Sequence, residues 1–119
     1  GGSSYETSNY FFGNQRGYSS GTFAERKSTS QGSIRLGGDV TTDTNSVFNG
    51  YFYMYNAGDS SKYTFFTSHN TFTQGSTYTM EFGSGVYAVA STINAIQIGQ
   101  GILSAFSSGT ISAYGVKES

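Results

Sequence analysis

Three side chains in one polar stretch are the best candidates for binding a metal ion. Asp39, Asp43 and Asn45 follow one another at spacings of four and two residues. Carboxylate and amide oxygens in such a loop are ligands that Ca²⁺ accepts, although this loop lacks the bidentate Glu of an EF-hand. The competing interpretation is a solvated turn in which Asp and Asn bond their own backbone. We therefore expect no cofactor, with Ca²⁺ at this loop as the alternative.

The single histidine, His69, is the candidate general base. Its neighbours Ser68 and Asn70 are polar, and no acid is close to it in sequence. A Ser-His-Asp triad can be assembled from distant positions, but the chain has no Gly-x-Ser-x-Gly elbow. A surface histidine at a polar strand end is the simpler interpretation.

Paired carboxylates, as used in glycoside hydrolysis, would have to come from seven acids. These are Glu6, Glu25, Asp39, Asp43, Asp59, Glu81 and Glu118. Only for Glu81 is the local alternation clear, and it predicts a side chain on the solvent face. Gly83-Ser84-Gly85 has no helix after it, which indicates a turn and not a phosphate loop. We expect that the protein is not an enzyme.

Composition excludes several further classes. Without cysteine there is no disulfide, thiolate metal site or thiol nucleophile, and one histidine cannot build an imidazole cluster for zinc. A net charge of -1 with six scattered Lys and Arg argues against a nucleic-acid partner. The apolar stretches are too short for a transmembrane helix or a signal-peptide core, so no membrane partner is expected.

Binding chemistry is better represented, in a row of tyrosines. Tyr51, Tyr53 and Tyr55 alternate along one segment, and Tyr63 follows as a possible fourth member. Such rings offer flat apolar faces with hydroxyl tips, and they stack on sugars or form protein interfaces. The alternative is that they complete the core or a crowded sheet face. These four residues are the candidate interface or glycan face.

The elements that position these residues are predicted to be strands. Ten Tyr, ten Phe and many Gly, Ser and Thr suit pleated sheets and tight turns, and leucine occurs only twice. Residues 1–4 are expected to be a flexible lead-in, and 5–117 a single domain. The strands are predicted near 5–12, 21–27, 32–37, 47–56, 62–69, 76–82, 86–91, 93–99 and 109–116. Polar turns are expected at 27–31, 56–61 and 104–109, with a longer polar loop at 38–46.

Alternation predicts which strand faces are buried. Tyr78, Met80 and Phe82 alternate with polar residues, which is typical of an antiparallel strand with one buried face. Ile34 and Leu36 alternate in the same way. The segment 47–55 is apolar on both sides: Phe48, Phe52 and Met54 can fill a core while the tyrosines line the opposite face. A hairpin turn at Asn49-Gly50 is the alternative for this segment.

These patterns predict an all-β fold, an antiparallel two-sheet β-sandwich of the jelly-roll kind with about eight strands. The segment 51–56 has no charge and no proline, so an exposed edge there would promote aggregation. A protein that keeps such a strand usually covers it by oligomerisation. The composition therefore favours a multichain setting.

Several segments of the chain resemble a known module. They are Phe48-Asn49-Gly50-Tyr51, the stretch from Asp59 to Phe66, Gly85-Val86-Tyr87, 91–98 and the ending Ser-Gly-Thr-Ile-Ser-Ala-Tyr-Gly-Val-Lys at 108–117. Together they are similar to a jelly-roll module of tailed-phage virion structural proteins, found in capsid decoration proteins and in head or tail fibres. The likeness covers 47–117, whereas 1–46 match only in β character and in the strand at Arg35-Leu36.

The resemblance implies a non-enzymatic virion structural protein, either a capsid decoration protein or an appendage subunit. It implies assembly with itself, often as a trimer, and with other virion proteins, and hence a location in the virion. The alternative is a receptor-binding fibre tip that recognises host surface glycan through exposed tyrosines. The resemblance supplies no functional residues.

Overall fold

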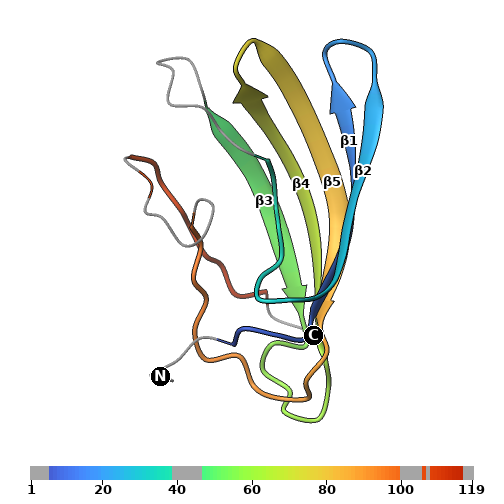
Figure 1. Ribbon diagram of the computed structural model, residues 1–119. Coiled ribbons are helices and arrows are strands. Elements are labelled where there is room, and N and C mark those ends of the chain that lie inside the picture. Colours follow the sequence, from blue (N-terminus) through green and yellow to red (C-terminus); the bar gives the residue numbers. More distant parts are fainter. Residues whose placement is uncertain (1–5, 39–46, 100–105, 107, 117–119) are drawn as a thin grey trace.

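The computed structural model describes residues 6–38, 47–99, 106 and 108–116. In this part of the chain the fold is one antiparallel sheet of five strands, in the order β2-β1-β5-β4-β3 (Figure 1). The strands are β1 (Tyr10–Tyr18), β2 (Phe23–Gln31), β3 (Phe48–Tyr55), β4 (Thr64–Gln74) and β5 (Thr77–Tyr87). No helix able to cross a membrane occurs among these residues.

Turns join β1 to β2, β3 to β4 and β4 to β5. Gly75 opens the two-residue turn between β4 and β5 with φ of 60°, and Gly21 turns the chain between β1 and β2 with φ of 86°. Both angles lie in the left-handed region, which glycine adopts without the steric cost that a side chain brings. The turn expected at 56–61 is present between β3 and β4, and Asn56 takes a positive φ of 63° there.

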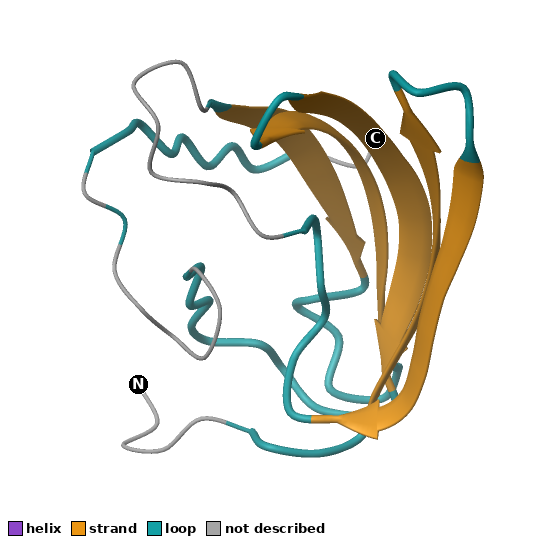
Figure 2. Ribbon diagram, turned by 45° about the horizontal axis from the view of Figure 1, so that its top comes forward, coloured by secondary structure: helices purple, strands orange, loops and turns teal. Residues whose placement is uncertain are grey.

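The sheet is curved, and coil segments lie on its concave side (Figure 2). The segment 33–38 packs directly onto the strands there. A Cβ atom at Gly37 would meet the ring of Phe48, and one at Gly38 would meet the guanidinium of Arg16, so a larger residue at either position would displace these side chains. We call this concave side, on which the segment 33–38 lies, the covered face.

The small core lies under these segments. Phe12, Phe72 and Tyr87 are buried, at 8%, 3% and 2% exposure, and all three point to the covered face. Tyr10 packs against Tyr87 with ring centroids 4.9 Å apart. Burial raises the pKa of both tyrosines. The neighbouring Tyr87 raises the pKa of Tyr10 further.

The all-β prediction is confirmed, but the second sheet and the jelly-roll topology are not. Residues 32–37, 88–91, 93–99 and 109–116 were predicted as strands and have no regular structure. In the segment 35–37 the reason is visible, because its carbonyl oxygens accept hydrogen bonds from side chains of the sheet and pair with no other strand.

Two boundary predictions were wrong. The first strand, predicted near 5–12, runs from Tyr10 to Tyr18 and passes through Gly13 and Gly17. The polar stretch 27–31 is not a turn but the second half of β2, an edge strand whose polar side chains are exposed. The continuous strand predicted at 47–56 is confirmed and its alternative, a hairpin at Asn49-Gly50, is excluded, since β3 pairs with β4 without a break from Phe48 to Tyr55.

Candidate interaction surface

The convex side of the sheet is uncovered by any segment that the structure describes, and we call it the open face. Alternation along each strand sends every second side chain there. Its members are Phe11, Gly13, Gln15 and Gly17 of β1; Phe23, Glu25, Lys27 and Thr29 of β2; Asn49, Tyr51, Tyr53 and Tyr55 of β3; Phe65, Thr67, His69, Thr71 and Thr73 of β4; and Tyr78, Met80, Phe82, Ser84 and Val86 of β5.

Large apolar side chains dominate this face. Tyr51, Tyr53 and Tyr55 are about half exposed, at 55%, 52% and 48%. On β5, Tyr78, Met80 and Phe82 are 65%, 46% and 42% exposed. Scattered apolar residues on a surface are normal, but a face that exposes large apolar side chains on four of its strands, β2, β3, β4 and β5, is typical of an interaction site.

The burial predicted for β5 is inverted. Alternation indicated that Tyr78, Met80 and Phe82 face the core, whereas the structure buries Thr79 and Glu81, each at 1% exposure. The polar side of β5 is buried because the covering segment 33–38 presents backbone carbonyls to the sheet. Carbonyls need hydrogen-bond donors opposite them, so the polar side of the sheet is the one they cover.

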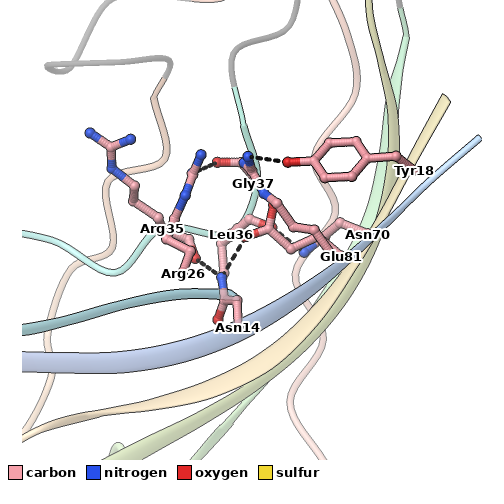
Figure 3. A network of polar contacts seen from close by, with 9 residues as sticks. Asn14, Tyr18, Arg26, Arg35, Leu36, Gly37, Asn70 and Glu81 are labelled. Carbon is pink, nitrogen blue, oxygen red and sulfur yellow. Dashed lines mark hydrogen bonds and ion pairs between the residues drawn. The ribbon is translucent and has the colours of Figure 1, made fainter. Parts of the chain in front are cut away.

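Those donors form the polar network in Figure 3. Asn14 Nδ2 donates to the carbonyl oxygen of Arg35 over 2.8 Å, and Asn70 Nδ2 donates to that of Leu36. Arg26 Nη1 donates to the carbonyl oxygen of Gly37 over 3.0 Å. Three side chains from three strands thus hold three consecutive residues of the covering segment.

Glu81 lies at the centre of this network. Its Oε2 accepts a 2.7 Å hydrogen bond from Arg16 Nε, and its Oε1 accepts one of 2.7 Å from Asn14 Nδ2. Arg16 Nη1 also lies 3.4 Å from the Tyr18 hydroxyl. Burial alone would lower the pKa of Arg16, but the bonds to Tyr18 and Glu81 and the charge of Glu81 outweigh it and raise the pKa. The carboxylate is occupied by these contacts and enclosed, which favours a structural role.

The tyrosine row is held in place by polar contacts on the open face. The Tyr51 hydroxyl lies 3.2 Å from Nδ1 of His69, and the Tyr55 hydroxyl lies 3.1 Å from Oγ1 of Thr67. His69 also packs edge-on against Phe82, with ring centroids 5.5 Å apart. The structure therefore brings Tyr51, Tyr53 and Tyr55 onto one face, as the alternation predicted.

Tyr63 takes a different place from the other three tyrosines. It lies just before β4 starts at Thr64, is 49% exposed, and its carbonyl oxygen accepts a bond from Asn56 Nδ2. Nearby, Asp59 accepts hydrogen bonds from the hydroxyl and the amide of Ser61 and forms an ion pair with Lys62. These bonds, the Ser61 hydroxyl first, lower the pKa of Asp59 to about 2.

A shallow furrow runs along the middle of the open face. Small residues on β1 and β5, chiefly Gly13 and Ser84, leave a hollow of about 550 Å³ between the side chains of Phe11, Phe65 and Lys27. A second hollow of about 290 Å³ continues past Gly13 toward Phe82. The face therefore has both protruding rings and a depression to receive them.

The other candidate groups do not assemble into a site among the described residues. Asp39, Asp43 and Asn45 lie outside them, and no cluster of three metal-binding side chains occurs in the part that the structure describes. His69 contacts a tyrosine and a phenylalanine, and Glu6 and Glu25 are exposed on the surface. No described carboxylate pair faces a cavity.

Asn14, Arg16, Asn70 and Glu81 were missed as structural residues. One signal was available in β1, where Gly13, Gln15 and Gly17 alternate with Phe12, Asn14, Arg16 and Tyr18. A strand with two glycines on one face has its larger side chains on the other, which is the face that packs in this structure.

Comparison with protein-family models, with curated proteins and with solved structures found no match to this chain.

Proposed function

We propose that the chain is a non-enzymatic structural subunit of a bacteriophage particle, and that it assembles with copies of itself through the open face and also with other virion proteins. The observation that carries the assembly role is the exposure of large apolar side chains on the open face. On β2, β3, β4 and β5 such side chains stay exposed there, whereas the covered face packs the small core of Phe12, Phe72 and Tyr87 beside a hydrogen-bonded polar network. A partner that covers the open face would remove this apolar surface from water.

The open face has the character of a subunit contact. It combines aromatic rings and a methionine with few charges, and interface cores are enriched in these residues and depleted of charged ones. Among the strand residues that point to it, only Glu25 and Lys27 carry a full charge. A charged ligand such as a nucleic acid finds no matching stripe on this surface.

The phage setting is supported by the sequence resemblance of 47–117 to virion modules, which also implies the trimer. The virion role is tested by a binding assay on phage particles. Purified protein is mixed with phage particles that lack it, and bound copies are counted after sedimentation of the particles. Saturable binding that is lost in Phe82→Asp but retained in the control Ile96→Asp, at an exposed residue outside the strands, supports the proposal. Absence of binding to every particle tested would overturn the phage role.

A second candidate function is recognition of a host surface glycan. The row of Tyr51, Tyr53 and Tyr55 favours it, because exposed rings with hydroxyl groups and the neighbouring His69 and Thr67 resemble the stacking platforms on which sugars lie. In this case the protein is a fibre tip. A glycan array separates the two roles: binding that is lost in Tyr51→Ala and Tyr53→Ala but retained in Tyr114→Ala supports the tip, and no binding at millimolar ligand excludes it.

A further inference from the structure

Two neighbouring rows of side chains cross the whole open face. Strand register defines them, since each row contains the residues paired across the five strands. The first row consists of Lys27, Gly13, Ser84, Thr67 and Tyr53. The second row consists of Glu25, Gln15, Phe82, His69 and Tyr51. We call them the small row and the large row, because at three of the five strands the first has the smaller side chain.

The two rows are complementary in charge or size at four of the five strands. On β2 a lysine in the small row corresponds to a glutamate in the large row. On β1, β5 and β4, Gly, Ser and Thr correspond to Gln, Phe and His, and on β3 two tyrosines correspond to each other. A surface that is complementary to itself in this way fits a second copy related by a two-fold axis, because each contact then occurs twice.

We propose that two copies of this chain pack their open faces together about a two-fold axis that runs across the strands between the small row and the large row. This inference rests on the proposed assembly function and names the partner on that face. The axis places the small row of each copy above the large row of the other. Facing sheets lie about 10 Å apart, which is the distance that two layers of side chains fill.

The hollows fit this arrangement. Phe82 of the large row is 42% exposed on β5, and Ser84 of the small row lies next to it on the other side of the axis. The axis therefore aims Phe82 and Gln15 of each copy at the hollow of about 550 Å³ around Gly13 and Ser84 of the other. Aromatic rings that enter a pocket near the centre of an interface contribute much of its binding free energy.

The next rows outward continue the match of large with small. The same axis sets Phe11 against Gly17 of the other copy on β1. It sets Phe65 against Thr71 on β4, and Tyr55 against Asn49 on β3. Because the open face is convex, contact is closest at the middle strands, and the long side chains of Glu25 and Lys27 bridge the wider gap at the margin. This two-fold contact takes the place, on this face, of the trimer that the resemblance implies.

The first test fills the hollow. A Cβ atom added at Gly13 meets nothing within 4 Å, so the strand has room for a side chain there, and Gly13→Leu places one in the space meant for the partner's Gln15 and Phe82. Gly58 is equally open but lies in the turn after β3, so Gly58→Leu is the matched control. We expect wild type and Gly58→Leu to form dimers in analytical ultracentrifugation, and Gly13→Leu to dissociate at least about tenfold more readily.

The second test exchanges the charges. Glu25→Lys or Lys27→Glu places like charges opposite each other twice per dimer, which weakens association by about threefold to tenfold. The double variant Glu25→Lys/Lys27→Glu restores the opposite pairs and the wild-type dissociation constant. Carbodiimide cross-linking of a mixture of ¹⁵N-labelled and unlabelled protein gives Glu25–Lys27 peptides of mixed isotope composition if the contact lies between copies.

The outcomes separate this inference from the proposed function. A trimer, a monomer that still binds phage particles, or a dimer unaffected by Gly13→Leu and by the charge exchange overturns the two-fold contact and leaves the virion role standing. Dimers that behave as described but bind no particle overturn the virion role and support the contact. Glycan binding through the tyrosine row that leaves dimer formation unchanged shows that the dimer does not cover this face, and it overturns the two-fold contact.

Discussion

Glu81 and Arg16 are register partners on β5 and β1, and their side chains form a 2.7 Å ion pair that is buried under the segment 33–38. The side chains are 0% and 8% exposed, respectively. The two charges satisfy each other on the covered face, so their burial there leaves neither without a partner. Tyr78, Met80 and Phe82, which alternate with Thr79 and Glu81 on β5, therefore point to the open face.

Breaking the ion pair should destabilise the fold strongly. Glu81→Leu leaves the guanidinium of Arg16 buried without its partner, and we expect a loss of about 3–5 kcal/mol in the free energy of unfolding. The measurement is urea denaturation followed by circular dichroism. The double variant Arg16→Met/Glu81→Leu removes both charges and should lose less than the single variant. A double variant as unstable as the sum of both single changes would contradict this assignment.

Stability should also distinguish the two faces. Phe72 is 3% exposed on the covered face, and Phe72→Ala is expected to lose about 3–5 kcal/mol through the cavity that it leaves. Tyr78 is 65% exposed on the open face, so Tyr78→Thr should change the free energy of unfolding by less than about 0.5 kcal/mol. Denaturation at low protein concentration checks both. A large loss in Tyr78→Thr would mean that this side of β5 is the buried one.

The covering segment should open more often when its hydrogen-bond donors are removed. Asn70→Ala leaves the carbonyl oxygen of Leu36 without the bond that Asn70 donates, at a cost of about 1–3 kcal/mol. Trypsin cleaves after the exposed Arg35, so its rate at this site reports local opening. We expect cleavage there to become about tenfold faster. Asn49→Ala, on the open face, is the control. Equal cleavage rates in both variants would show that Asn70 does not hold the covering segment on the sheet.

The turn before β4 should respond to acid. Hydrogen bonds from Ser61 and the contact with Lys62 lower the pKa of Asp59 from 3.8 to about 2. A carboxyl with a depressed pKa stabilises the folded turn above the unfolded value, and this contribution is lost as the pH falls from about 3.8 to about 2. The ¹³C shift of the carboxyl carbon should titrate near 2. Ser61→Ala should raise the pKa toward 3.8, and an unchanged pKa in that variant would contradict the assigned cause.

The strand-rich composition was sufficient to predict the class of fold. The aromatic and β-branched residues and the glycine turns indicated strands, and β3 separates Tyr51 and Tyr53 from Phe52 as its alternation predicted. Alternation identifies two faces of a strand but not which one is covered. That choice depends on residues distant in sequence, such as Arg35 and Leu36, whose carbonyl oxygens need the donors of Asn14 and Asn70.

The same limit explains the inverted prediction for β5. Hydrophobicity alone favoured burial of Met80 and Phe82, and Glu81 was expected in solvent. A buried glutamate requires a matched cation, and Arg16, its partner, is 65 residues away in the chain. The complementary rows on the open face likewise depend on the register between strands, which short-range patterns in the sequence do not define.

The most direct measurement of the central claim uses the two methionines, one on each face. Met80 lies on the open face of β5 and is 46% exposed, whereas Met54 points to the covered face of β3. The rate of oxidation by dilute peroxide is followed for each by mass spectrometry as the protein concentration is raised. We predict that oxidation of Met80 slows as the protein associates while that of Met54 stays constant. Association that leaves Met80 as reactive as in the monomer would contradict the claim that the open face is the contact.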